Sequence, residues 1–356
     1  MSPSLLHYCS LSREETEDFF KRRGWPRFRA DQFFHALYKR RIFDPANMTN
    51  LPAAMREALA SDGSAALPEI AQEQISTDGT RKWLVKFADG KLAETVYIPE
   101  TGRGTLCVSS QIGCSLTCSF CHTGTQKLQR NLTADEIVGQ YLLAEARLGQ
   151  SSPDIAERGP VTNVVMMGMG EPLINYDNVA RALRILMEPE GIGFSKRKIT
   201  LSTSGYVPKI VACGEELGVN LAVSLHATTD EVRDSLVPLN RKYPIAALLE
   251  ACRAYPHNSA YRRMTFEYVM LDGINDADAD AERLAEIIAP IPAKVNLIPF
   301  NPWPGSAYRC SPEERIARFA HMLERRGAYV TVRTPRGRDI FAACGQLKSA
   351  NALAVA

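Results

Sequence analysis

Three cysteines in one short stretch have the spacing of a metal-cluster site. Cys114, Cys118 and Cys121 follow the pattern C-x-x-x-C-x-x-C in a segment that begins at Gly113. Thiolates at this spacing can turn inward from one loop and bind three irons of a cubane 4Fe–4S cluster, which normally takes four thiolates. Because no fourth cysteine follows at short spacing, one iron would be open to another ligand. An open iron suits chemistry on a bound small molecule, whereas an electron carrier is better served by four closed positions.

Two plainer interpretations of the trio are a zinc loop and buried, unpaired thiols. A structural zinc site needs four protein ligands, usually two pairs of cysteine or histidine, and His122, next to Cys121, is poorly spaced for one. The trio therefore favours the cluster. Its spacing resembles that of the radical S-adenosylmethionine (SAM) superfamily, in which the open iron binds the amino and carboxylate groups of SAM.

The chain as a whole has the composition of an ordinary globular protein. Its 356 residues, 45% hydrophobic and 23% charged, suffice for one large α/β domain and a smaller appendage. We find no 18-residue apolar run and no export signal, and the nine cysteines are scattered except for the trio. We therefore expect a cytoplasmic protein with reduced thiols and no membrane association. With a net charge of only +2, any affinity for nucleic acid must come from local patches.

Predicted strands and helices alternate from about residue 104 onward. The expected strands cover 105–110, 163–168, 198–203, 219–225, 263–270, 294–300 and 328–333, and helices begin near 133, 177, 207, 244, 276 and 311. This alternation predicts a parallel sheet with right-handed crossovers. Six or so units would make a partial (β/α)6 barrel over 104–348, with functional residues at the C-terminal ends of the strands. The trio follows the first strand directly.

The first hundred residues predict two smaller parts. We expect a helical accessory domain over 1–68, a β-rich connection over 69–103, and a tail over 349–356. Residues 21–41 carry eight Lys or Arg against one acid, with aromatic residues between them. This set is either a solvated basic face over a helical core or a patch that binds RNA phosphates. The candidate RNA contacts are Lys21, Arg22, Arg23, Lys39, Arg40 and Arg41.

Polar residues and glycines gather where the barrel strands are expected to end. A lone Gly-Glu in a loop is usually a turn, but Gly170-Glu171 follows the second strand, where an acid can hold an ammonium group. In that context it resembles the SAM-amine motif of the superfamily. Similar positions follow the later strands: Ser202 after the third, Ser224, Leu225 and His226 after the fourth, and Asn301 after the sixth.

Two further cysteines narrow the resemblance. Cys107 lies seven residues before the trio, and Cys344 lies in an Ala-Ala-Cys-Gly-Gln-Leu segment near the C-terminus. Taken singly, each is most simply a small buried residue. Together with the segments 105–111 and 263–271, they resemble the RlmN/Cfr family of radical SAM adenosine methyltransferases that act on RNA. The resemblance spans residues 10–348.

This resemblance implies a reaction that uses two SAM molecules in each turnover. The first would methylate Cys344, and the second would be cleaved to a 5′-deoxyadenosyl radical that takes hydrogen from the new S-methyl group. The carbon radical would add to an adenine ring carbon, Cys107 would resolve the protein–RNA adduct through a transient disulfide, and Glu94 would accept a proton. The family's SAM contacts match Gly170, Glu171, Ser202, Ser224, Leu225, His226 and Asn301.

Segments 170–173 and 299–305 resemble the branch that methylates C2 of an adenosine in 23S rRNA and in the anticodon loop of some tRNAs. The resemblance further implies a low-potential electron donor such as flavodoxin, and we expect a monomer. The alternatives are a C8-methylating Cfr-like enzyme, a different radical SAM enzyme, and a non-enzymatic RNA-binding or electron-transfer protein. A methylthiotransferase is disfavoured because it needs a second cluster, and the remaining cysteines, Cys9, Cys213, Cys252 and Cys310, are too scattered to hold one.

Overall fold

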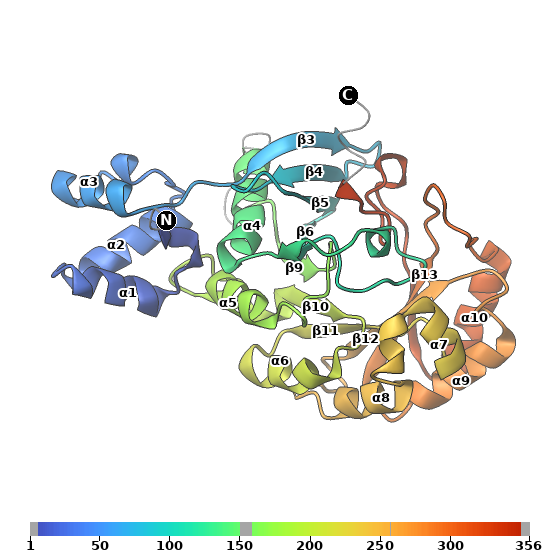
Figure 1. The fold of residues 1–356 in the computed structure, drawn as a ribbon. Coiled ribbons are helices and arrows are strands. Elements are labelled where there is room, and N and C mark those ends of the chain that lie inside the picture. The colour runs from blue at the N-terminus through green and yellow to red at the C-terminus, as the bar shows by residue number, and fades with distance from the viewer. Residues whose placement is uncertain (1–5, 150–158, 257, 350–356) are drawn as a thin grey trace.

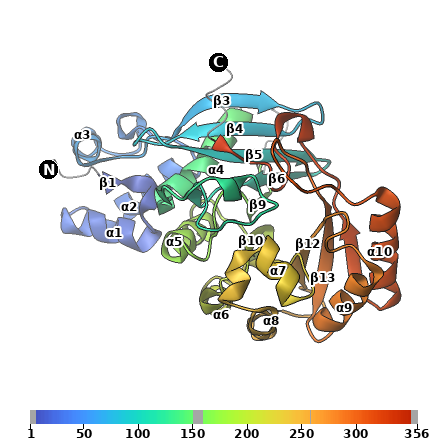
Figure 2. The same cartoon turned by 45° about the vertical axis from the view of Figure 1, so that its right-hand side comes forward.

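A single ten-stranded sheet organises the computed structural model, which describes residues 6–149, 159–256 and 258–349. Its strand order is β14-β13-β12-β11-β10-β9-β6-β5-β4-β3. The seven strands from β14 to β6 run parallel, and the strands from β6 to β3 run antiparallel. The parallel part curves while helices cover its outer side, which makes an open barrel (Figures 1 and 2).

Seven parallel strands and seven helices form the barrel, as six strand–helix units and a last strand that no α-helix follows in the described residues. The strands are β6 (Arg103–Cys107), β9 (Asn163–Met166), β10 (Ile199–Thr203), β11 (Asn220–Ser224), β12 (Met264–Met270), β13 (Ala293–Pro299) and β14 (Tyr329–Val332). The helices are α4 (Ala134–Gly149), α5 (Tyr176–Met187), α6 (Ile210–Glu216), α7 (Asp230–Leu236), α8 (Ile245–Arg253), α9 (Asp278–Ile288) and α10 (Glu313–Arg325). All seven predicted barrel strands are confirmed. Helix α7 was not predicted from the sequence.

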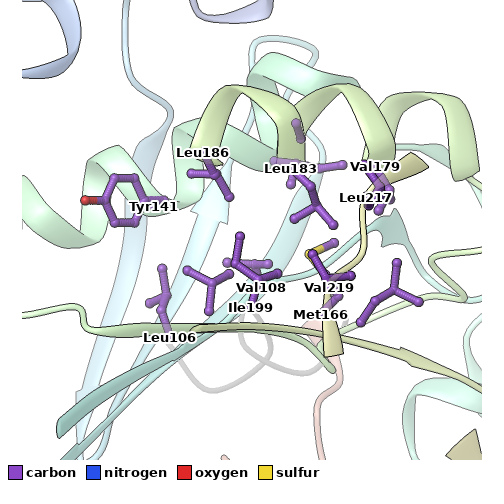
Figure 3. Packing of buried hydrophobic residues seen from close by; sticks show 14 of the residues in the cluster. Leu106, Val108, Tyr141, Met166, Val179, Leu183, Leu186, Ile199, Leu217 and Val219 are labelled. Atoms are coloured by element: carbon purple, nitrogen blue, oxygen red, sulfur yellow. The ribbon is translucent and has the colours of Figure 1, made fainter. Parts of the chain in front are cut away.

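The side chains of β12 show how one strand serves both sides of the sheet. All seven of its residues are buried. Met264 and Phe266 belong to the apolar core, whereas Thr265 and Glu267 alternate with them and line the barrel interior. Successive side chains of a strand point to opposite faces, so the apolar set packs on the helices and the polar set is left for the interior. The same division holds around the sheet: Figure 3 shows Leu106, Met166 and Ile199 packed against Leu183 and Leu186 of α5.

The segment before the barrel extends the same sheet. Strands β3 (Glu69–Ile75), β4 (Arg81–Lys86) and β5 (Leu92–Glu100) are antiparallel, and β5 pairs with β6. A turn at Asp89-Gly90 joins β4 to β5, where Gly90 has a φ of +78° and donates its N–H to the carbonyl of Phe87. The sheet has no break here. The predicted boundary at residue 103 therefore falls within one sheet, at β6, which pairs antiparallel with β5 and parallel with β9.

Three N-terminal helices lie at one end of the molecule (Figure 1), and the 3-10 turn Tyr8–Ser10 before them contacts α4 and α5. The three helices are α1 (Arg13–Arg22), α2 (Arg27–Tyr38) and α3 (Ala53–Asp62), joined by the short parallel pair β1 (Leu6–His7) and β2 (Gly63–Ser64). A capping box starts α1, since Ser12 and Glu15 each accept the other's backbone N–H. The predicted tail at 349–356 lies almost entirely outside the described residues.

Candidate active site

The cysteine trio lies in the loop between two short strands, β7 (Gln111–Ile112) and β8 (Arg130–Asn131), directly after β6. Gly113 starts this loop with a φ of +77°, a conformation that suits glycine and that turns the chain toward the barrel mouth. The three cysteines line one pocket. This pocket brings together residues that lie up to 231 positions apart, because Gly345, next to Cys344, lines it together with Cys114.

The donor set of this pocket fits a cationic cluster. Burial is the largest cause that raises the pKa of Cys114, to about 12, and it also raises the pKa of Cys118 and Cys121. The neutral thiols are therefore favoured until a positive charge is bound, and iron would supply that charge and deprotonate them. Among the described residues, no group of three His, Cys, Asp or Glu side chains lies close enough to hold a single metal ion. The fit therefore rests on three thiols that share one pocket.

Glu171 is held beside the trio by backbone and side-chain contacts. Its carboxylate accepts the N–H of Ser204 at 2.8 Å and that of Leu173 at 3.2 Å. Gln111 accepts the N–H of Glu171 at 3.0 Å and that of Ser115 at 3.1 Å, so one amide ties this acid to the cluster loop. Burial raises the pKa of Glu171. A buried carboxylate in this position could bind an ammonium group, which would restore its charge.

Gly170 precedes Glu171 at a point where a side chain has no room. Its φ is +97°, and a Cβ here would lie 2.5 Å from the Cβ of Gln111. This glycine therefore lets the strand end pass close to the cluster loop. Gln111 itself was not singled out from the sequence, because an isolated glutamine carries no spacing signal.

Most of the predicted SAM residues line this pocket. Gly170, Glu171, Ser202, Ser224, His226 and Asn301 do so. Leu225 does not line it: the residue is fully buried, and its backbone bonds Glu267 and Arg233. The roles of all seven as SAM contacts stay predictions.

His226 has an unusual backbone for its residue type. Its φ is +62°, and non-glycine residues in this region are uncommon and cluster at functional sites. Its Nδ1 accepts the N–H of Val269 at 3.1 Å, and its ring packs on the edge of Phe120 at 4.7 Å. Burial, with a smaller effect of Arg233, lowers the pKa of His226 to about 3. The ring is therefore neutral at physiological pH and carries its proton on Nε2.

Arg233 links the ends of two barrel strands beneath the pocket. This fully buried guanidinium on α7 donates to the carbonyls of Ser204, Ser224 and Leu225 and to the side chain of Asn240, at 2.8 to 3.0 Å. Burial lowers its pKa to about 10, so it stays charged at neutral pH. Arg233 was not predicted to support the site, because nothing in the neighbouring sequence distinguishes it from an exposed arginine.

We expect Arg233→Met to destabilise the fold strongly. Two buried and two partly buried acceptors would lose their donor, and each buried one costs roughly 1–3 kcal/mol when left unsatisfied, so the loss should be on the order of 4 kcal/mol. Denaturant unfolding measures this loss. Arg241→Met, at an exposed arginine nearby, is the matched control and should change the free energy of unfolding very little. A loss below about 1 kcal/mol for Arg233→Met would contradict the proposed role.

The segment that carries Cys344 is held from three sides. His122 donates its backbone N–H to Gly345 at 2.7 Å, and Thr123 donates its hydroxyl to Leu347 at 2.7 Å. Asn301 donates its amide to the carbonyl of Cys344 at 3.2 Å. On the third side lie the antiparallel strands β3–β5 and the turn between β3 and β4, which we call the β-extension. It forms hydrogen bonds with the same segment through Ser76, Asp78, Lys82 and Glu94. The residue after the trio, His122, thus has a structural contact, and its ring stacks on Trp303 at 4.6 Å.

Cys107 lies in an adjoining cavity that also contains Cys121 and Cys344. Burial is the main cause that raises the pKa of Cys107 to about 12; nearby Cys344 raises it further and Arg333 lowers it. Arg333 lines both the pocket and the cavity and lies 3.8 Å from Glu267. All these thiols are free, and Cys344 is exposed. Arg333 therefore places a positive charge between two cysteines that the sequence separates by 237 residues.

Glu94 lies on β5 at the back of this arrangement and does not line the pocket or the cavity. It is buried, pairs with Lys82 at 3.1 Å, and accepts the N–H of Lys348 at 2.6 Å. Burial raises its pKa, whereas the charge of Lys82 lowers it. Lys82 also donates to the carbonyl of Phe341 at 3.3 Å. This buried pair therefore joins the β-extension to the Cys344 segment.

Half of the predicted RNA contacts have partners within the chain. Arg23 bonds Asp62 at 2.9 Å, Lys39 bonds the carbonyl of Pro189 at 3.1 Å, and Arg41 pairs with the buried Glu145. These three contacts hold the N-terminal helices together or attach them to the barrel. Lys21, Arg22 and Arg40 are exposed. The six residues as an RNA patch stay a prediction. In the described part of the chain, no helix is long and apolar enough to cross a membrane.

A strand-end cysteine trio on a partial barrel, with a glycine–acid turn beside it, defines the radical SAM class of enzymes. The model of the radical SAM superfamily matches residues 108–285, and that of the ribosomal RNA large subunit methyltransferase N-terminal domain matches residues 7–63. The chain is 56% identical to the dual-specificity RNA methyltransferase RlmN of Rhodospirillum rubrum, over 98% of this chain and 81% of the relative. It is 57% identical to RlmN of Parvibaculum lavamentivorans, over 96% and 89%.

The solved structure of a radical SAM methyltransferase from Sphaerobacter thermophilus is similar over its whole length. It is 46% identical, has a TM-score of 0.90, and covers 97% of this chain and 99% of its own. The chain belongs to the RlmN family of radical SAM RNA methyltransferases.

Proposed function

We propose that this protein methylates C2 of an adenosine in 23S rRNA and in the anticodon loop of some tRNAs, with two SAM molecules per turnover. The observation that carries this proposal is the shared cavity of Cys107, Cys121 and Cys344. A radical SAM enzyme that only cleaves SAM has no need for two further thiols at its cluster. A methylation that passes through a thioether needs one thiol to carry the methyl group and a second to release the product.

Cys114, Cys118 and Cys121 would hold the 4Fe–4S cluster, which supplies the electron for the reductive cleavage of SAM. Glu171 is suited to hold the amino group of SAM, and Ser202 and Ser224 offer hydroxyls along the same wall of the pocket. Cys344 is suited to carry the methyl group because it is exposed and lies in a segment fixed by backbone bonds. The electron comes from a low-potential donor.

The different surroundings of Cys344 and Cys107 suit them to different roles in the reaction. The exposed thiol can reach SAM and RNA, whereas Cys107 is only partly exposed and has a pKa raised to about 12. A thiol that is neutral at physiological pH is a poor nucleophile toward SAM. We therefore assign the methyl carrier to Cys344 and the resolving step to Cys107, with Glu94 as the proton acceptor.

The target base must leave its stack to reach this cavity. An extruded base costs least in single-stranded loops, which fits loops of rRNA and the anticodon loop of tRNA as substrates. The test is mass spectrometry of nucleosides from a 23S rRNA fragment and a tRNA transcript after reaction with SAM and a reductant. We expect 2-methyladenosine; 8-methyladenosine would assign the chain to C8 chemistry, and no methylated adenosine in either RNA would refute the proposal.

The proposed role of Glu94 predicts a distinct pH dependence. A proton acceptor must be ionised, so activity should fall as the pH drops through the pKa of Glu94, which burial raises above its ordinary value. Lys82→Met removes the charge that lowers this pKa, so we expect the acidic limb of the single-turnover rate to move to higher pH. Glu94→Gln should lower the rate by about 10²–10⁴-fold at pH values above the acidic limb, and its own rate should no longer show that limb.

Lys82→Arg is the matched control, because it keeps the charge beside Glu94 and should leave the acidic limb near its wild-type position. An acidic limb that does not move in Lys82→Met would show that another group limits the rate.

A further inference from the structure

A second pocket opens at the other end of the barrel, where the strands begin. Its volume is about 840 Å³, and five cationic side chains line it: Lys196, Arg197, Arg262, Arg263 and Lys294. They come from the segments that lead into β10 and β12 and from the start of β13. Because the N-terminal ends of parallel strands meet at one edge of a sheet, charges far apart in the sequence gather here.

Cations outnumber acids around this pocket. Burial raises the pKa of Glu267, which lines the adjoining cavity, and the charge of Lys294 lowers it. Among the described residues that line the pocket, none is acidic, and in the described part of the chain none of the five forms a salt bridge. Arg262 is occupied by structural bonds to Gly218 and Asn220, whereas Lys196, Arg197 and Lys294 are exposed. Arg197 also lowers the pKa of Arg262, after the effect of burial. Like charges held together in excess over acids are the electrostatic footprint of a site for a polyanion.

Two exposed tyrosines flank the same pocket. Tyr261 is 101% exposed and Tyr329 is 58% exposed, both unusual for large aromatic side chains. The guanidinium of Arg263 lies 3.7 Å from the ring centroid of Tyr329. Aromatic rings beside cations are the platform on which single-stranded nucleic acids stack their bases.

The pocket adjoins the cavity of the two cysteines. Thr200, Thr265 and Lys294 line both. From Thr265 to Val269, which lines the cluster pocket, β12 rises by four residues, or roughly 13 Å. The basic end of the barrel therefore borders the cavity that contains Cys344.

We infer that this basic pocket binds the phosphates and unstacked bases of the single-stranded RNA that flanks the target adenosine. The inference rests on the proposed function, since it takes RNA as the substrate. The cations would hold the backbone at the open end of the barrel while the target base lies inside. The exposed tyrosines would stack neighbouring bases without reading their identity.

The test uses the full chain with its cluster and a tRNA transcript that the wild-type enzyme methylates. In Lys196→Ser/Arg197→Ser, two phosphate contacts should be lost. The slope of log affinity against log salt should then fall in magnitude by about 1.4, at about 0.7 per contact, and RNA affinity at 0.1 M salt by about tenfold or more. The mass of the Cys344 peptide, with its methyl group, shows that the variant is folded and holds its cluster.

The matched control is Arg253→Ser/Arg325→Ser, which removes the same charge from exposed positions on α8 and α10 and should change neither slope nor affinity. Tyr261→Ala should lower affinity about tenfold, and Tyr261→Phe should keep it, because only the ring is needed for stacking. If the wild-type enzyme methylates the tRNA, and Lys196→Ser/Arg197→Ser binds it with unchanged affinity and salt slope, this inference is overturned. The proposed function would then still stand.

Two other outcomes separate the causes of failure. In the first, Lys196→Ser/Arg197→Ser binds RNA with unchanged affinity and turns over with dithionite but not with a flavodoxin donor. This result would overturn the inference and assign the pocket to the binding of an acidic protein. A wild-type enzyme that methylates its own Cys344 but no RNA would refute the proposed function, and the inference with it.

Discussion

Replacing Cys344 with alanine should abolish RNA methylation while the cluster stays in place. The side chain of Cys344 lies outside the trio, so its loss should leave the iron content and the visible absorbance unchanged. Without its thiol, no atom in the cavity is suited to carry the methyl group, because the pKa of the partly exposed Cys107 is raised to about 12. Incorporation of labelled methyl groups from SAM into RNA measures the expected loss, which should reach background.

The control for this variant is Cys310→Ala. Cys310 is a free cysteine of intermediate exposure, and it lines neither the cluster pocket nor the adjoining cavity. Its replacement should leave both the methylation rate and the iron content at wild-type values. Methylated RNA from Cys344→Ala at a measurable fraction of the wild-type rate would show that the methyl group reaches adenine by another route.

The barrel and the cysteine trio could be predicted because each produces a pattern among residues that are close in the sequence. Alternation of short apolar strands with helices identified all seven barrel strands, and the spacing of Cys114, Cys118 and Cys121 identified the cluster loop. Such signals are readable because each depends on residues a few positions apart. Gly170-Glu171 was found for the same reason, since it directly follows a predicted strand.

The contacts that support the site could not be predicted, because they join residues distant in sequence and of ordinary type. Arg233 binds carbonyls on two strand ends, and Lys82 joins the β-extension to the Cys344 segment. Nothing in the neighbouring sequence distinguishes these cations from solvated ones. Conversely, residues 21–41 stood out by composition alone, yet Arg23, Lys39 and Arg41 have partners within the chain. Charge density in a sequence does not tell a free cation from a paired one.

Replacing Cys107 with alanine should trap the enzyme on its RNA. If Cys107 resolves the adduct by forming a disulfide with Cys344, its loss should leave a covalent protein–RNA species that accumulates to nearly one equivalent. A denaturing gel detects it as a band containing both protein and RNA. Cys107→Ala/Cys344→Ala should give no such band, because the adduct needs Cys344. Free methylated RNA formed by Cys107→Ala at the wild-type rate would exclude the resolving role.

The environment of Cys107 predicts how fast the wild-type enzyme clears this adduct. Only the thiolate attacks, and the pKa of Cys107 is raised to about 12, mainly by burial. Below that pKa, the thiolate fraction rises tenfold for each pH unit, so adduct decay should quicken by about tenfold per unit between pH 7 and 9. Arg333→Met removes the cation that lowers this pKa and should slow decay at every pH in that range, whereas Arg333→Lys should largely preserve it. A decay rate that does not change with pH, and that is the same in the wild type and in Arg333→Met, would mean that Cys107 is not the attacking thiol.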